Sequence, residues 1–207
     1  AGFIYEINAL SLLGKVDEII ALFEESKRLP VSVNYNPGLL LSSNAGPRLR
    51  GYGFSEESMT VLEMALDWYA SQSGEENIDY RSRIASTLYF LERWQDARVI
   101  YTELHQETGE YLRYLGWIAA HLGENDEARF WGEQLAANTD TLTFNRYYSG
   151  RHQAMLAALL GDRERAVQLL RRSINEGSDH TPMLPRDIDF EGLWDYPPFQ
   201  ALFTYFP

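Results

Sequence analysis

One short element recurs along this chain: the end of a helix, a tight turn and a new amphipathic helix. Its clearest copy is "AALLGDRERAVQLLRRS" at residues 157–173, where Gly161 and Asp162 separate two apolar helical patterns. Aligning similar stretches on the turn gives five copies, with turns at Gly14, Gly53, Glu92, Gly123 and Gly161. The intervals are 39, 39, 31 and 38 residues. A unit that recurs at this period predicts stacked pairs of helices.

Side-chain size follows the same register. Seven residues before the last four turns the chain carries only small residues, namely Gly46, Ala85, Gly116 and Ala154. Small residues let two helices approach closely, and large residues fill the space beside the next pair. One pair cannot bury its apolar face alone, so at least three must stack. We therefore predict an all-α fold built from about five helix-turn-helix pairs.

This pattern resembles the tetratricopeptide repeat, whose helix pairs recur about every 34 residues. The resemblance extends over roughly residues 3–176 and is best in the third and fifth pairs. It departs from the family in interval length and in lacking the proline that usually ends a repeat, so related helical-pair solenoids are the alternative. The resemblance implies a right-handed superhelical solenoid over residues 1–179.

A proline interrupts the first helix expected in the second pair, within residues 33–53. Pro47 would lose one backbone hydrogen bond and clash with the carbonyl of Ser43, at a cost of about 3 kcal/mol. We expect either a kinked helix here or a helix that ends before Gly46 and gives way to a loop.

Residues 180–207 do not contain another full helix pair, but they are rich in apolar side chains: Met183, Leu184, Phe190, Leu193, Trp194, Phe199, Leu202 and Phe203. The last pair of a solenoid needs a cover that is polar on its outer side. We predict that this segment caps the last repeat, so that the whole chain forms one domain.

The end of the chain carries a second resemblance. "LLGDRERAVQLLRRSINEG" followed by "DFEGLWDYPPFQALF" is similar to the end of tetratricopeptide regions in bacterial multidomain signalling proteins. These are adenylate cyclases, serine/threonine kinases and winged-helix regulators. The resemblance implies a regulatory or partner-binding module of a larger protein or assembly.

Composition excludes several classes of partner. A net charge of −12 disfavours nonspecific binding of nucleic acid. No window approaches eighteen apolar residues, so we expect no membrane insertion. The chain has no cysteine, so disulfides do not indicate its compartment. It starts at Ala1, and a removed leader could have preceded that residue. The compartment therefore stays open, with the cytoplasm slightly favoured over the periplasm.

The sequence contains no recognisable catalytic motif. The phosphate-binding and nucleophile motifs GxxxxGK[ST] and GxSxG are absent, and the four histidines lack the HExxH spacing of a zinc site. We therefore predict a protein that is not an enzyme, with no catalytic residues, no metal and no cofactor.

Candidate binding residues follow from the family resemblance. In tetratricopeptide arrays the first helices of each pair line a concave groove, and the family's contact positions include Tyr89, Arg113, Trp117, Tyr148 and Arg151 of this chain. Arginine and aromatic side chains are the usual anchors of interfaces, and arginine can bind a carboxylate through two parallel hydrogen bonds. We expect a protein or peptide partner with acidic or carboxylate groups. The alternative for Trp117 and Tyr148 is plain packing between pairs.

Some family members are chaperone cofactors that clamp a terminal carboxylate with two lysines. Ile4 and Asp79 occupy those positions here, and an aspartate would repel the carboxylate, so we reject that activity. Two functions of a different kind stay open. One is a sensory domain that binds a small ligand, near Trp194 and the tail, and the second is a carbohydrate-active enzyme of the α/α-toroid kind.

Overall fold

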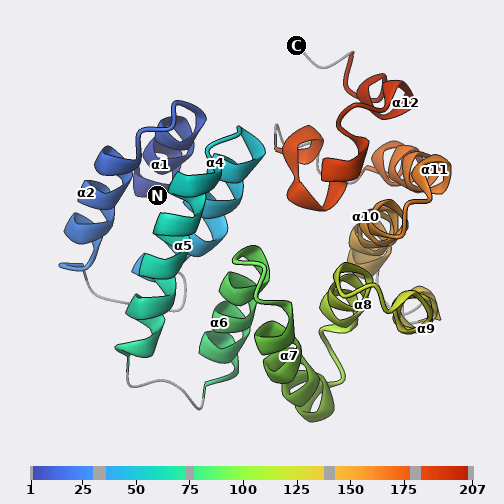
Figure 1. Ribbon diagram of the computed structural model, residues 1–207, viewed down its shortest axis with the longest axis horizontal. Helices are drawn as coiled ribbons and strands as arrows, with labels where there is room; N and C mark the ends of the chain where they lie inside the picture. The colour runs from blue at the N-terminus through green and yellow to red at the C-terminus, as the bar shows by residue number, and fades with distance from the viewer. Residues whose placement is uncertain (1, 30–35, 73–76, 138–142, 178–182, 205–207) are drawn as a thin grey trace. The chain divides into compact units, whose positions relative to one another are not determined.

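A computed structural model describes residues 2–29, 36–72, 77–137, 143–177 and 183–204, without the side chains of residues 143–149. Within these ranges every regular element is helical (Figure 1). The all-α prediction is therefore confirmed for the described part of the chain.

The helices fall into two compact units, residues 1–100 and residues 101–207, with one helix running from the first into the second. Unit 1 contains α1 (Gly2–Leu12), α2 (Val16–Ser26), α3 (Pro37–Leu39), the π-helix η1 (Leu40–Ala45), α4 (Gly46–Gly51), α5 (Ser55–Ala70), α6 (Ile78–Phe90) and the start of α7 (Trp94–Thr108). Unit 2 contains the rest of α7, α8 (Leu112–His121), α9 (Asn125–Ala137), α10 (Thr143–Leu159), α11 (Arg163–Asn175), the 3-10 helices η3 (Leu184–Arg186) and η4 (Ile188–Leu193), and α12 (Pro197–Gln200).

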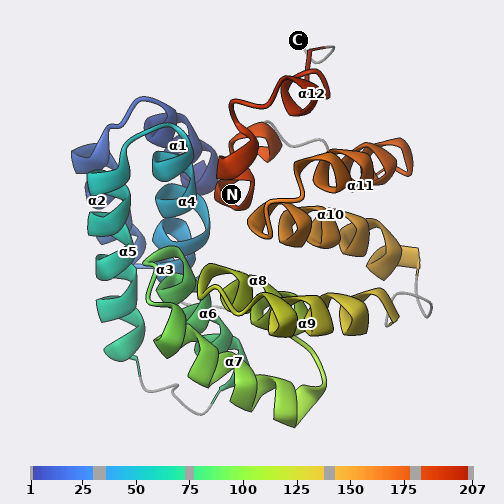
Figure 2. The ribbon, with the colours of Figure 1, turned by 45° about the vertical axis from the view of Figure 1, so that its right-hand side comes forward.

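Consecutive helices pack as neighbouring pairs. The pairs α1–α2, α4–α5, α8–α9 and α10–α11 are in contact, and α8–α9 and α10–α11 lie side by side in Figure 2. The residue at each of the five predicted turns has a left-handed backbone, with φ of 64° at Gly14, 90° at Gly53, 59° at Glu92, 76° at Gly123 and 79° at Gly161. Because a left-handed residue ends a helix and redirects the chain, each of these residues separates two helices. The prediction of neighbouring helix pairs is confirmed.

The small residues of the repeat lie where two helices approach closely. A Cβ atom on Gly46 would come within 2.5 Å of Leu62 Cδ2, and one on Gly116 would come within 3.3 Å of the Cβ of Trp131. These glycines therefore set the separation of α4 from α5 and of α8 from α9.

The chain accommodates Pro47 without a loop. The helical path runs from Pro37 to Gly51, and its middle part, η1, is a π-helix in which the Gly46 amide donates to the carbonyl of Leu41, five residues back. This shift in the hydrogen-bonding register removes the need for an α-helical bond from residue 47 to Ser43. Of the two alternatives expected here, the helix that ends before Gly46 and gives way to a loop is therefore wrong, since α4 continues to Gly51. Residues 33–35 lie outside the described ranges.

Side chains satisfy the backbone carbonyls around this π-helix. Asn44 Nδ2 donates to the carbonyl of Leu39 at 2.9 Å, and Ser58 Oγ donates to the carbonyl of Gly46 at 2.7 Å. Buried carbonyl groups cost free energy unless they are paired, so these two bonds stabilise the wider turn.

The described part of the tail is folded into unit 2. Phe190 is 0% exposed and its ring centroid lies 5.5 Å from that of Phe199, while η4 packs against α10. Further along, Asp195 Oδ1 lies 3.5 Å from Arg163 Nη1 at the start of α11. The described part of the tail thus contacts the last helix pair, and Asp189 also lies 3.9 Å from His121 of α8. The full cap over residues 180–207 stays a prediction.

Candidate functional site

The five candidate binding residues divide between the two units. Arg113 and Trp117 lie on α8, and Tyr148 and Arg151 lie on α10, all in unit 2. The side chain of Tyr148 lies outside the described ones. Tyr89 lies on α6 in unit 1, is 0% exposed and packs edge-on against Trp94, with 5.1 Å between ring centroids. In this conformation Tyr89 belongs to the core of unit 1.

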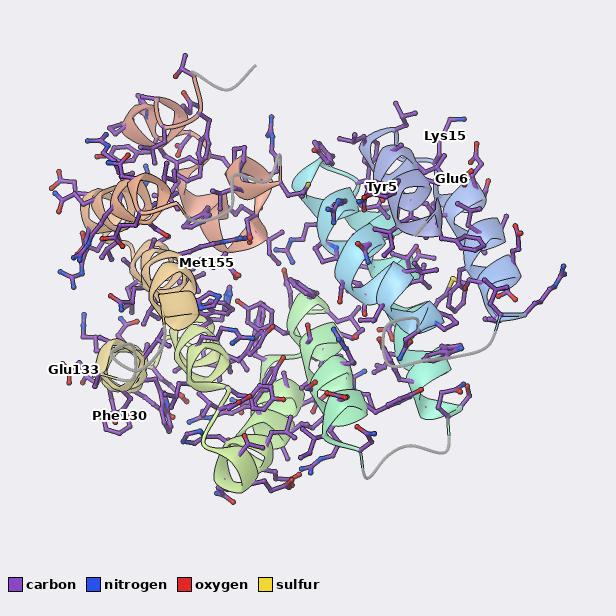
Figure 3. The ribbon with its side chains drawn as sticks, turned by 180° about the vertical axis from the view of Figure 1, so that it is seen from behind. Tyr5, Glu6, Lys15, Phe130, Glu133 and Met155 are labelled. Carbon is purple, nitrogen blue, oxygen red and sulfur yellow. The ribbon has the colours of Figure 1, made fainter. Side chains whose placement is uncertain are left out.

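Trp117 connects α8 to α10. Its Nε1 donates to the carbonyl of His152 at 3.2 Å, and its ring stands edge-on to the His152 ring with 5.3 Å between centroids. Only 5% of Trp117 is exposed, and Met155, one turn beyond Arg151 on α10, is also buried (Figure 3). This environment accords with a packing role for Trp117 between helix pairs.

An aromatic stack orients the half-buried side chain of Arg113. The Arg113 guanidinium carbon lies 4.6 Å from the centroid of the Tyr114 ring. Tyr114 in turn stacks nearly parallel on Tyr101, with 4.3 Å between centroids and 7° between planes. A guanidinium held over an aromatic face loses less entropy when it forms a further contact.

Arg151 holds a carboxylate that comes from the chain itself. Its Nη2 donates to Asp187 Oδ2 at 2.7 Å, and each side chain is only 20% exposed. Arg151 Nε is buried and has no acceptor among the described residues. The sequence predicts a carboxylate contact at this arginine, but it contains no signal that pairs it with a residue 36 positions away.

Asp187 is accompanied by a second carboxyl group that sequence reasoning missed. Asp189 is 5% exposed, and its Oδ1 lies 3.9 Å from Nε2 of His121, at the end of α8. Burial and the neighbouring Asp189 raise the pKa of Asp187 to about 6, although Arg151 opposes this shift. We call Arg151, Asp187, Asp189 and His121 the carboxylate cluster. In the sequence, the one signal that could have pointed to this pair of acids is their close spacing in "RDID", residues 186–189.

His152 lies near enough to Arg113 and Arg151 for both charges to act on it. Its burial, followed by the charges of Arg113 and Arg151, lowers the pKa of its imidazole well below the usual value. The neutral ring packs on Trp117, so this part of the α8–α10 interface depends on an uncharged histidine.

We expect acid to destabilise unit 2 through His152. An unfolded histidine takes up a proton near pH 6.5, whereas His152 in the folded protein does not. The unfolded state then binds more protons, so the free energy of unfolding falls by up to about 1.4 kcal/mol per pH unit below pH 6.5. Urea unfolding of the intact chain and of His152→Gln between pH 7 and pH 5 measures this effect, with His105→Gln on α7 as control.

The stability of His152→Gln should fall less with acid than that of the unchanged chain, while His105→Gln should follow the unchanged chain. Equal acid sensitivity in His152→Gln and the unchanged chain would contradict the assignment.

Within the described ranges, no three His, Cys, Asp or Glu side chains are grouped in a way that could hold a metal ion. The same part of the chain has no helix that is both long and apolar enough to cross a bilayer. Comparison with protein-family models, with curated proteins and with solved structures finds no match to this chain.

Proposed function

We propose that this chain is a non-catalytic scaffold that binds a protein or peptide partner, as a regulatory module of a larger protein or assembly. In this proposal the helix pairs form a right-handed superhelical solenoid similar to a tetratricopeptide array, and the first helices of the pairs line its groove. The left-handed residues at the five turns and the buried small residues between paired helices support it.

The observation that carries this proposal is the carboxylate bound by Arg151. Arg151 of α10, a helix that packs on α8, donates to the Asp187 carboxylate through a charge-assisted hydrogen bond of 2.7 Å, which supports a preference for acidic groups here. Arg113, oriented by Tyr114, supplies a second cation on α8. The partner proposed for this surface carries acidic or C-terminal carboxylate groups, which bind Arg113 and compete with Asp187 for Arg151.

Selection of peptides against the intact chain tests the proposal. Peptides displayed on phage are selected for binding, and the affinities of synthetic copies are then measured for the unchanged chain, Arg113→Glu and Arg129→Glu. Arg129 is the matched control because it is a 60% exposed arginine on α9, the second helix of its pair. We expect acidic or carboxylate-ended peptides whose affinity falls about tenfold or more in Arg113→Glu and is unchanged in Arg129→Glu.

Melting temperatures of the same variants separate binding from folding. A strong decrease in the melting temperature of Arg113→Glu would assign Arg113 a structural role. Selected peptides that lack acidic groups, or that bind Arg113→Glu as well as the unchanged chain, would refute the proposed surface.

One observation favours a sensory domain as the second candidate function. Trp194 Nε1 and Arg151 Nε are both buried N–H donors without an acceptor among the described residues. Buried donors cost free energy when they are unpaired, and a small ligand with acceptor oxygens would satisfy them.

A further inference from the structure

Charged side chains that are largely removed from solvent connect the tail to α8 and α10. Asp187 accepts from Arg151 through Oδ2, and its Oδ1 accepts from the backbone amide of Asp189 at 3.3 Å. Asp189 is itself 5% exposed and faces His121. The start of η4 therefore brings two carboxyl groups against one arginine from α10 and one histidine from α8.

Two acids share this cluster with one guanidinium group. Arg151 supplies one positive charge, and His121 supplies another only when it is protonated. Two carboxylates close together out of solvent repel each other, and a proton on either one removes that repulsion. A proton on His121 would add an attraction to Asp189 instead.

We propose that the carboxylate cluster is a proton-sensitive latch, which holds residues 184–200 to α8 and α10 more firmly in mildly acidic solution than at neutral or higher pH. The inference is independent of whether the chain binds a partner.

The direction follows from proton linkage. The pKa of Asp187 is raised to about 6 in the docked tail, whereas a solvated aspartate titrates near pH 3.9. The docked state therefore binds more protons between these values. Its extra stability is complete below about pH 3.9 and is lost as the pH rises through about 6.

Other charged groups near the latch do not reverse this direction. His121 lies 3.9 Å from Asp189, so a positive charge on it would attract that carboxylate, and Arg186 is exposed to solvent. Acid acts on His152 in the opposite direction, because its pKa is lowered in the folded protein. Its ring packs on Trp117, so a proton on His152 weakens the contact between α8 and α10 rather than the docking of η4. A measurement that reports on η4 and on α8 individually therefore distinguishes the effect of the latch from that of His152.

Hydrogen–deuterium exchange of the intact chain makes this separation. Protection factors of the amides in η4 and in α8 are measured at pH 5, 6, 7 and 8. We expect the η4 protection factors to fall about tenfold from pH 5 to pH 8, as a docked pKa near 6 and a solvated pKa near 3.9 require, while those of α8 do not fall. Asp187→Asn should abolish the pH dependence in η4. Asp195→Asn is the matched control, because Asp195 is a 78% exposed acid of the same tail, and it should retain the dependence.

Two results would overturn the latch: η4 protection that is equal at pH 5 and pH 8, or the same pH dependence in Asp187→Asn as in the unchanged chain. Should Asp187→Asn not fold, Asp189→Asn provides the second test. Removing the Asp189 charge should move the midpoint of the η4 transition to lower pH, and an unchanged midpoint would also overturn the proposal.

Discussion

Replacing Phe190 with alanine is expected to lower the free energy of unfolding of unit 2 by about 3 to 5 kcal/mol. Phe190 is 0% exposed and packs on Phe199, so its removal loses buried apolar area and leaves a cavity between the tail and its neighbours. Urea unfolding of the intact chain at neutral pH, followed by circular dichroism, measures the loss.

Phe130→Ala is the matched control. Phe130 lies on α9 in the same unit and is 50% exposed, so its truncation should cost less than about 1 kcal/mol (Figure 3). If Phe190→Ala is no more destabilising than Phe130→Ala, the tail is a docking element for a partner rather than part of the fold.

Replacing the small buried residues of the repeat with larger ones should also lower the free energy of unfolding. Ala128 and Ala166 are each 0% exposed, five residues after the turns at Gly123 and Gly161. Replacing either with leucine adds three carbon atoms to a closely packed contact and should cost about 1 to 3 kcal/mol. Ala136→Leu is the control, because Ala136 is exposed on the same helix as Ala128, and it should change stability by less than about 0.5 kcal/mol.

The same unfolding measurement distinguishes the outcomes. If the chain tolerates Ala128→Leu and Ala166→Leu as well as it tolerates Ala136→Leu, the alignment of the repeat on its turns is wrong.

Local sequence signals predict the five turns between helices because turn and capping geometry depend on a few adjacent residues. Asp162, which the sequence places between two helical patterns, caps α11, and its Oδ1 accepts from the amide of Arg165 at 3.1 Å. Glu92 is placed at a turn by alignment alone and has the positive φ that glycine has in the other four turns.

The candidate site could be predicted only in part. The family resemblance selected Arg113 and Arg151, which lie on the first helices of two neighbouring helix pairs. The charges of both arginines contribute to the lowered pKa of His152. It did not show that Asp187 binds Arg151, because the pairing of side chains far apart in sequence depends on how the chain packs.

The sequence alone determined the all-α class, the helix pairs and the positions of their turns, since these follow from periodicity and from residues a few positions apart. The tertiary structure decided how Pro47 is accommodated, because the π-helix η1 is stabilised by contacts such as the Ser58–Gly46 bond, which joins α5 to α4. It also decided the raised pKa of Asp187, since the pKa of a carboxyl group depends on burial and on charges that folding brings near it.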